Sequence, residues 1–270
     1  MGFSEFSIKE LLSSLTTVGI SEGDIILVHS SLLHLGQLSG GDPQAMPHRI
    51  ISALTSYIGK FGTLVALAPN YDYSNKGIPF DTRHSPVAHE LGVLSAALAA
   101  HPDAERSANP IFSLAALGAM ADHICNGSNA SAFGSDSAWD RAVGAGAKIL
   151  LLGSSFERLT IIRYIEQCAG VPYLYVKLFS TKIYRNKVEL PYKVTALLRY
   201  PNLPINYDLS SFERELCSDG IIKEARLGGG EIKSMDALKC VRTGIQRINN
   251  DIHFFLAHPP PYIDCDPHFA

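Results

Sequence analysis

The chain has 270 residues, which is long enough to bury a substantial hydrophobic core. Its 46% apolar and 18% charged residues exclude a disordered protein, and its formal net charge of -3 argues against a nucleic-acid-binding protein, which needs a basic face. The apolar runs are too short for a membrane-spanning helix, and Met1–Ile20 lacks the pattern of a secretory signal.

The first part of the chain predicts helices that alternate with buried strands. A helix over Ser7–Thr17, capped by the Ser7 hydroxyl, precedes the apolar run Ile25–Val28, which is typical of a buried strand. A long segment rich in Asn, Tyr, Asp, Gly and Pro, over residues 69–86, has the character of a functional loop. The remaining predicted elements up to residue 168 are, in chain order, the helix Pro47–Lys60, the strand Gly62–Ala68, the helix Glu90–Ala100, the strand Phe112–Leu117, the helix Trp139–Ala145, the strand Ala147–Leu152 and the helix Leu159–Cys168.

The pattern changes after residue 171. The sequence there predicts three successive strands, then helices on both sides of a glycine turn, and a proline-rich surface tail: Tyr173–Phe179, Lys187–Leu190, Val194–Tyr200, Phe212–Leu216, the turn Gly228–Gly230, Ser234–Leu256 and the tail His258–Tyr262. We therefore expect an α/β protein with a mostly parallel central sheet flanked by helices and an antiparallel excursion after residue 171. One domain over residues 1–270 accounts for the whole chain.

Polar side chains follow the first predicted strand. His29, Ser30 and Ser31 come directly after Val28, and in parallel sheets ligands gather beyond the carboxyl ends of the strands. These groups can donate hydrogen bonds to a carbonyl or a phosphate. The competing interpretation is a histidine satisfied by its neighbours and serines that cap a helix.

Two other segments carry groups with binding potential. Asn109 and Ser113 can form hydrogen bonds with the amides of a pantetheine arm, although they also suit an ordinary surface turn. Tyr71, Asp72 and Asp81 combine carboxylates with aromatic rings, which suits a ligand rich in amines and hydroxyls. The alternative for this loop is that its own tyrosines pack it.

Arg163 and Glu166 lie three residues apart on the helix predicted after the Ala147–Leu152 strand, so both project from one face. The commonest explanation of such a pattern is a surface ion pair. Motifs of other enzyme classes, such as G-x-S-x-G, a phosphate-binding P-loop, His-Glu-x-x-His and C-x-x-C, are absent. The five scattered cysteines have no metal-ligand spacing, so we expect a reducing cytoplasmic location and no metal.

Taken in order along the chain, several segments resemble the aminoglycoside 3-N-acetyltransferase family. The likeness runs from near residue 8 to the last helix and is carried by Gly23–Leu32, Phe80-Asp81, Ser85–Val87, Gly92, Arg106-Ser107, Pro110, Ser113, Leu150–Gly153, Tyr164–Gln167, Gly170–Tyr173 and Lys177–Phe179. The stretch Val171–Phe179 is more similar to members found in cell-surface polysaccharide pathways than to the antibiotic-resistance enzymes.

The resemblance implies the α/β fold of that family, acetyl-CoA as the acyl donor and an amine on a sugar or aminocyclitol ring as the acceptor. It also implies that the donor-binding side is formed by His29, Ser30, Ser31, Asn109, Phe112 and Ser113. Groups near Ser113 or Ser30 would stabilise the oxyanion of an acyl transfer. The partner is then a small amino sugar rather than a nucleic acid or a membrane, and a homo-oligomer is compatible with this interpretation.

The chain departs from the family at one position. The family has a His-x-x-Glu pair where this sequence has Arg163 and Glu166, and arginine stays protonated, so it cannot act as a general base. Three hypotheses remain open. Glu166 is the base itself or another histidine enters the site, with His84 and His89 as candidates; Arg163 binds an anionic acceptor such as a nucleotide-linked sugar; or the chain is a catalytically silent protein that binds CoA or a sugar.

Overall fold

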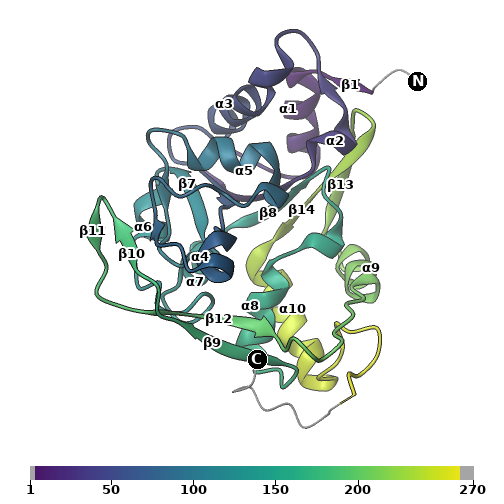
Figure 1. Ribbon diagram of the computed structural model, residues 1–270. Helices are drawn as coiled ribbons and strands as arrows, with labels where there is room; N and C mark the ends of the chain where they lie inside the picture. The colour runs from purple at the N-terminus through teal and green to yellow at the C-terminus, as the bar shows by residue number, and fades with distance from the viewer. Residues whose placement is uncertain (1–3, 262–270) are drawn as a thin grey trace.

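The computed structural model describes residues 4–261, and a sheet of seven strands forms its centre. Several of these strands can be followed in Figure 1. The central strands are short runs of buried aliphatic residues, as the sequence predicts. In spatial order the strands are β13 (Lys223–Leu227), β14 (Gly230–Asp236), β8 (Lys148–Leu152), β2 (Ile25–Ser30), β4 (Thr63–Leu67), β7 (Leu114–Gly118) and β6 (Glu105–Arg106).

Alternate residues of the central strands point into two separate hydrophobic clusters, one on each face of the sheet. Leu27 and Leu151 belong to one cluster, whereas their neighbours Val28 and Leu150 belong to the other. Four helices cover the second face and lie together at the top of Figure 1: α1 (Ile8–Thr17), α2 (Leu32–Leu35), α3 (Met46–Ile58) and α5 (Gly92–Ala99). The first face packs against α4 (Tyr71–Lys76), α6 (Ala121–Cys125), α7 (Ala138–Gly144), α8 (Ile161–Ala169), α9 (Ser210–Ser218) and α10 (Ala237–Asn250).

The α/β class and the flanking helices are confirmed, but the sheet is mixed where the sequence favoured a mostly parallel one. Within the seven-stranded sheet, β2–β4 and β2–β8 pair in parallel, and the outer strands on both sides pair antiparallel. An apolar run shows that a strand is buried on both faces, but it carries no information about the direction of the strand. Direction depends on the path of the connections.

The hairpin β13–β14 is the main element that the sequence prediction missed. The segment Gly228–Gly230 joins these two strands, not two helices, and the last helix begins at Ala237 instead of Ser234. β13 lies at the edge of the sheet and reads Lys-Glu-Ala-Arg-Leu, with mostly exposed side chains. Charged residues are common on edge strands and hide the apolar alternation that identifies a strand in a sequence.

The antiparallel excursion after residue 171 is confirmed. β9 (Leu174–Phe179) pairs antiparallel with β12 (Val194–Arg199), and β10 (Ile183–Arg185) pairs antiparallel with β11 (Val188–Glu189). The turn between β10 and β11 places Asn186 and Lys187 at positive φ, the geometry of a tight hairpin. β10 also pairs with β5 (Phe80–Asp81), which anchors the excursion to the loop after β4.

The smaller elements complete the fold. They are β1 (Glu5–Phe6) paired with β3 (Gln37–Leu38), and the short 3-10 helices η1 (Pro43–Ala45), η2 (His89–Leu91) and η3 (Phe156–Arg158). The predicted tail from His258 includes the described residues up to 261, whereas Tyr262 lies outside them. The single domain over residues 1–270 stays a prediction. Within residues 4–261, none of the helices is both long and apolar enough to cross a bilayer.

Candidate active site at the ends of the parallel strands

The parallel strands β4, β2 and β8 end together beside a cavity of about 280 Å³. Its walls include His29 and Ser30 from β2, Leu67 from β4, and Ser154 and Thr160 from the segment that follows β8. We call it the histidine cavity. Ligands in open α/β sheets gather at this edge, because the loops beyond the strand ends leave a crevice there.

Two further cavities adjoin the histidine cavity. One of about 520 Å³, the apolar cavity, is lined mainly by residues around α2, η1 and the first turns of α3 and α5: Ser30, Ser31, Leu32, Leu33, Gly36, Gln37, Pro43, Gln44, Met46, Pro47, Glu90, Gly92, Val93 and Arg158. The other, of about 200 Å³, is the arginine cavity, lined by Phe112, Glu157, Arg158, Leu159, Thr160, Ile162, Arg163, Arg199, Tyr207 and Leu209.

Shared walls place the three cavities in one row. Ser30 and Glu90 line both the apolar and the histidine cavity, Thr160 lines both the histidine and the arginine cavity, and Arg158 lines all three. A larger hollow of about 820 Å³ lies elsewhere, between α1 and α3, and is lined by residues such as Leu12. We place the candidate site in the row, since it lies at the strand ends and its walls include His29, Ser30, Ser31 and Arg163.

His29 is buried in the middle of this row. Only 7% of the residue is exposed, and within residues 4–261 its Nε2 atom has no hydrogen-bond partner. Burial lowers the pKa of the imidazole from 6.5 to about 4, so the ring is neutral near pH 7. A buried polar atom without a partner is uncommon in folded proteins and marks a place where a ligand or a water is accommodated.

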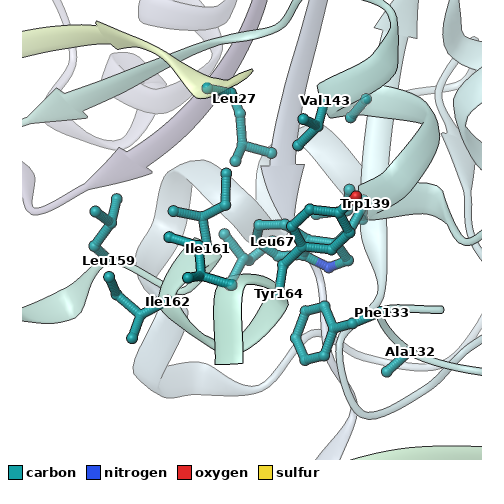
Figure 2. Close-up of a cluster of buried hydrophobic side chains, with 14 of the residues drawn as sticks. Leu27, Leu67, Ala132, Phe133, Trp139, Val143, Leu159, Ile161, Ile162 and Tyr164 are labelled. Carbon is teal, nitrogen blue, oxygen red and sulfur yellow. The ribbon is translucent and has the colours of Figure 1, made fainter. Parts of the chain in front are cut away.

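Helix α8 carries the Arg163 and Glu166 side chains and is fixed by its apolar face. Ile161 and Ile162 at its start belong to the same buried cluster as Leu27 and Leu67 of the sheet (Figure 2). On the far side, Ile165 packs against α10 at Gly244, where an added Cβ would lie 2.8 Å from the Ile165 Cδ1 atom. The helix therefore has little freedom to move, and its polar side chains are held in place.

Glu166 is fully buried and accepts three hydrogen bonds. Tyr173 Oη and Tyr207 Oη donate to Oε1 at 3.0 and 2.7 Å, and Arg163 Nη1 donates to Oε2 at 3.1 Å. Burial raises the pKa of the Glu166 carboxyl, and the Arg163 charge and the two tyrosine hydroxyls act in the opposite direction. The carboxylate does not reach solvent directly, but the half-buried Tyr207, which lines the arginine cavity, connects it to that space.

Arg163 completes this network. Its Nη1 also donates to Tyr207 Oη. Its guanidinium lies 4.7 Å from the centre of the Tyr207 ring, and the guanidinium of Arg199 lies at the same distance from that ring. Only 17% of the Arg163 side chain is exposed. The pair formed with Glu166 is thus buried, unlike the surface ion pair that the spacing alone would also permit.

The residues predicted to bind the donor divide into two groups. His29, Ser30, Ser31 and Phe112 line the row of cavities. Asn109 and Ser113 are buried and bind the protein itself: Asn109 Nδ2 donates to Asn129 O and Thr195 O, and Ser113 Oγ donates to Ser107 O at 2.9 Å. Their hydrogen bonds support the loop that carries Phe112.

The residues predicted on the acceptor side line none of these three cavities. Tyr71 and Asp72 begin α4, where Asp72 forms an ion pair with Lys76 at 2.9 Å. Asp81 accepts hydrogen bonds from the backbone of the following turn and lies 3.0 Å from the Nδ1 atom of His84, a side chain that is 64% exposed. The structure therefore does not bring His84 and Glu166 to one cavity.

Sequence reasoning did not single out Arg158, Arg199 or Tyr207 as site residues. Arg158 follows β8 on η3, Arg199 ends β12, and Tyr207 lies in the loop before α9. No local pattern marks them, because they come together only through the packing of the excursion against α8. Among residues 4–261, no group of three or more His, Cys, Asp or Glu side chains is placed to hold a metal ion.

Comparison with known proteins gives one family. The aminoglycoside 3-N-acetyltransferase family matches residues 27–249. Aminoglycoside N(3)-acetyltransferase III of Serratia marcescens is 32% identical over 182 residues, which cover 62% of this chain and 66% of that enzyme. Aminoglycoside N(3)-acetyltransferase IV of a Salmonella species is 29% identical over 266 residues, which cover 95% of this chain and 92% of that enzyme.

Solved structures agree with these relatives. The apoenzyme of aminoglycoside acetyltransferase AAC(3)-IVa has a TM-score of 0.75 and 27% identity, covering 94% of this chain and 92% of its own. A histidine-to-alanine variant of AAC(3)-IVa, solved in complex with a gentamicin, gives the same TM-score and identity. Aminoglycoside N(3)-acetyltransferase VII of Streptomyces paromomycinus is 32% identical over 183 residues, which cover 60% of this chain and 60% of that enzyme. This match and the match to the Serratia enzyme each cover less than two thirds of the relative's length.

Proposed function

The chain belongs to the aminoglycoside 3-N-acetyltransferase family, and from this premise we propose that it transfers an acyl group, acetyl in the simplest case, from coenzyme A to the amine of an amino sugar or an aminoglycoside-like acceptor. The observation that carries the proposal is the row of three cavities at the strand ends. In its middle lies the Nε2 atom of His29, which has no hydrogen-bond partner within residues 4–261, and at one end lies Tyr207, hydrogen-bonded to Glu166.

We assign the donor to the apolar and histidine cavities. Leu32, Leu33 and Val93 give the apolar cavity a surface that suits the pantetheine chain, and the Ser30 and Ser31 residues at its wall suit the amides of that chain. His29 offers its unpartnered Nε2 atom to the bound donor. When bound, acetyl-CoA supplies a thioester whose carbon forms a bond with the acceptor nitrogen while the carbon–sulfur bond breaks, giving an amide, a thiolate and one proton.

We assign the acceptor to the arginine cavity and the proton to Glu166 through Tyr207. The Tyr207 hydroxyl can accept a proton from the attacking nitrogen as it passes its own proton to Glu166 Oε1, which is 2.7 Å away. Arg163, held by Glu166 and Tyr207, keeps both groups oriented and does not itself act as a base. His84 takes no step in this scheme, because it lines none of the three cavities.

The size of the arginine cavity favours a small acceptor. Its volume of about 200 Å³ lies below the range of about 300–1,000 Å³ that is typical of pockets for drug-sized ligands. A single amino-sugar ring therefore suits it better than a whole aminoglycoside.

The cytoplasm remains the predicted location, since the four cysteines within residues 4–261 are all free thiols.

The test is an assay of thiol release from acetyl-CoA with gentamicin, apramycin and free amino sugars as acceptors, with mass spectrometry of the products. An acceptor whose mass increases by one acetyl group supports the proposal. If thiol release with every acceptor is no faster than the hydrolysis of acetyl-CoA alone, a catalytically silent homologue is favoured.

A pair of tyrosine variants tests the proton path. Tyr207→Phe and Tyr173→Phe each remove one hydrogen bond to Glu166, but only Tyr207 lines the arginine cavity. We expect Tyr207→Phe to lower kcat about 10²–10⁴-fold, the usual size of general acid–base effects, and Tyr173→Phe to have a much smaller effect. Equal losses in the two variants would mean that Tyr207 is not the relay.

A further inference from the structure

The arginine cavity has an unusual charge for a site that accepts amines. Its charged wall residues are three arginines and one glutamate: Arg158, Arg163, Arg199 and Glu157. The remaining wall residues are uncharged. Aminoglycosides are polycations, and a site built for them needs an excess of carboxylates, whereas this wall has an excess of positive charge.

Arg163 does not supply that excess. Its guanidinium donates to Glu166 Oε2 at 3.1 Å, and the fully buried Glu166 compensates its charge inside the protein. The pair is neutral as a unit. The charge that faces a ligand therefore comes from Arg158, Arg199 and Glu157, a balance of +1.

Arg199 is held in position but is not neutralised. Its guanidinium packs on the Tyr207 ring at 4.7 Å, close to the site of the proposed proton transfer. Within residues 4–261, neither its guanidinium nor that of Arg158 has a hydrogen-bond acceptor or an ion-pair partner in the structure. Arginine presents planar pairs of donors that match a carboxylate or a phosphate, and packing on a ring leaves those donors at the ring edge available.

Two guanidiniums, those of Arg163 and Arg199, lie against the same tyrosine ring. Because Glu166 compensates the charge of Arg163, the positive charges that remain on this wall are those of Arg199 and Arg158. An anionic ligand would compensate these charges, whereas a polycationic ligand would add to them. The arrangement thus discriminates between ligands by charge as well as by size.

We propose that the acceptor is an anionic amino sugar, whose carboxylate or phosphate is bound by Arg199 and Arg158 while its amine lies at the Tyr207 hydroxyl. The inference rests on the proposed function, because it places the acceptor in the same cavity. It names the substrate class and assigns the anion to Arg199 and Arg158, whereas one of the three hypotheses from the sequence gave that role to Arg163. The carboxylate and the phosphate share this chemistry, and separate acceptors distinguish them.

The experiment compares matched acceptors that differ in one group. Glucosamine, glucosamine 6-phosphate, 2-amino-2-deoxyglucuronate and UDP-glucosamine are acetylated with acetyl-CoA, and kcat/KM is measured by thiol release beside gentamicin. We expect at least one anionic sugar to exceed glucosamine by about 10–100-fold, the range for a charged hydrogen-bonded group. The best acceptor shows whether the anion is a carboxylate, a phosphate monoester or a diphosphate.

In the variant Arg199→Gln, kcat/KM for the best anionic sugar should exceed kcat/KM for glucosamine by no more than about threefold. The change should appear in the KM of the anionic acceptor, while the KM of acetyl-CoA stays unchanged. Arg242→Gln is the control, since Arg242 is an exposed arginine of α10 that lines none of the three cavities. The inference is overturned if gentamicin or glucosamine is preferred over every anionic sugar, or if Arg199→Gln raises the KM of acetyl-CoA instead.

Binding separates this inference from the proposed function. If no acceptor is acetylated, the proposed function fails, and calorimetry with glucosamine 6-phosphate and 2-amino-2-deoxyglucuronate then decides the inference alone. The anion site is supported if either anionic sugar binds the wild-type protein and its affinity falls at least about tenfold in Arg199→Gln but not in Arg242→Gln. Absence of binding to the wild-type protein, or equal binding to Arg199→Gln, overturns it.

Discussion

The substitution His29→Gln tests whether the buried imidazole is neutral in the folded protein. Gln is polar and of similar length but does not titrate, so it removes the response of this position to pH. In the wild-type protein, burial lowers the pKa of His29 from 6.5 to about 4. An unfolded chain leaves the same ring in water, where it binds a proton near pH 6.5.

The sign of the effect follows from this difference. Above pH 6.5 the ring is neutral in both states, and its contribution to stability is fully present. As the pH falls from 6.5 to about 4, the unfolded state binds a proton that the folded state does not, so stability is lost. Converted at about 1.4 kcal/mol for each tenfold change in proton concentration, the loss is about 3 kcal/mol.

Urea unfolding at pH 7, 6, 5 and 4 measures the free energy of unfolding of both proteins. We expect the wild-type protein to lose about 3 kcal/mol more than His29→Gln over this range. Ser30→Ala, on the same strand, is the control: any cost there should be independent of pH, because no titratable group is removed. Parallel curves for the wild-type protein and His29→Gln would refute the reasoning and mean that His29 titrates alike in both states.

Three further substitutions test the packing around the site. Glu166→Gln leaves the Arg163 charge buried without its partner, and we expect a loss of about 3–5 kcal/mol in urea unfolding; a loss below about 1 kcal/mol would mean that water reaches the pair. Gly244→Ala places a Cβ 2.8 Å from Ile165 Cδ1 and should lower the free energy of unfolding, measured by thermal unfolding, by about 1–3 kcal/mol. Adding Ile165→Val, which removes the Cδ1 atom, should restore part of this stability, and no restoration would contradict the clash. Asn109→Ala removes the donor of two backbone carbonyls and should cost about 1–3 kcal/mol with the KM of acetyl-CoA unchanged, whereas a large rise in that KM would show that Asn109 binds the donor.

The elements with strong local patterns were predictable from the sequence. The helix α1, with Ser7 and Glu10 forming a capping box, and the strands β2, β4 and β8 lie where the sequence places them, within a few residues. The edge strand β13 was not predictable, because its charged residues give no apolar alternation. Its partner β14 was hidden within a longer predicted helix.

The candidate site divides in the same way. His29 and Ser30 follow a buried strand, so their place beyond a strand end was a consequence of local pattern and of the rule for parallel sheets. Asn109 and Ser113 have side chains that suit either a ligand or the backbone, and only the structure shows that they bind the backbone. Composition cannot distinguish these two uses of one polar group.

By itself, the sequence determined the α/β class, the family resemblance and the replacement of the family histidine by Arg163, since each depends on residues that are near one another in the chain. Only the tertiary structure decided what that arginine contacts. Glu166 compensates its charge, while Arg158 and Arg199 reach the cavity from separate elements. Charge balance at a site depends on distance in space, and residues 158, 163, 199 and 207 share one wall because the excursion after residue 171 folds back over helix α8.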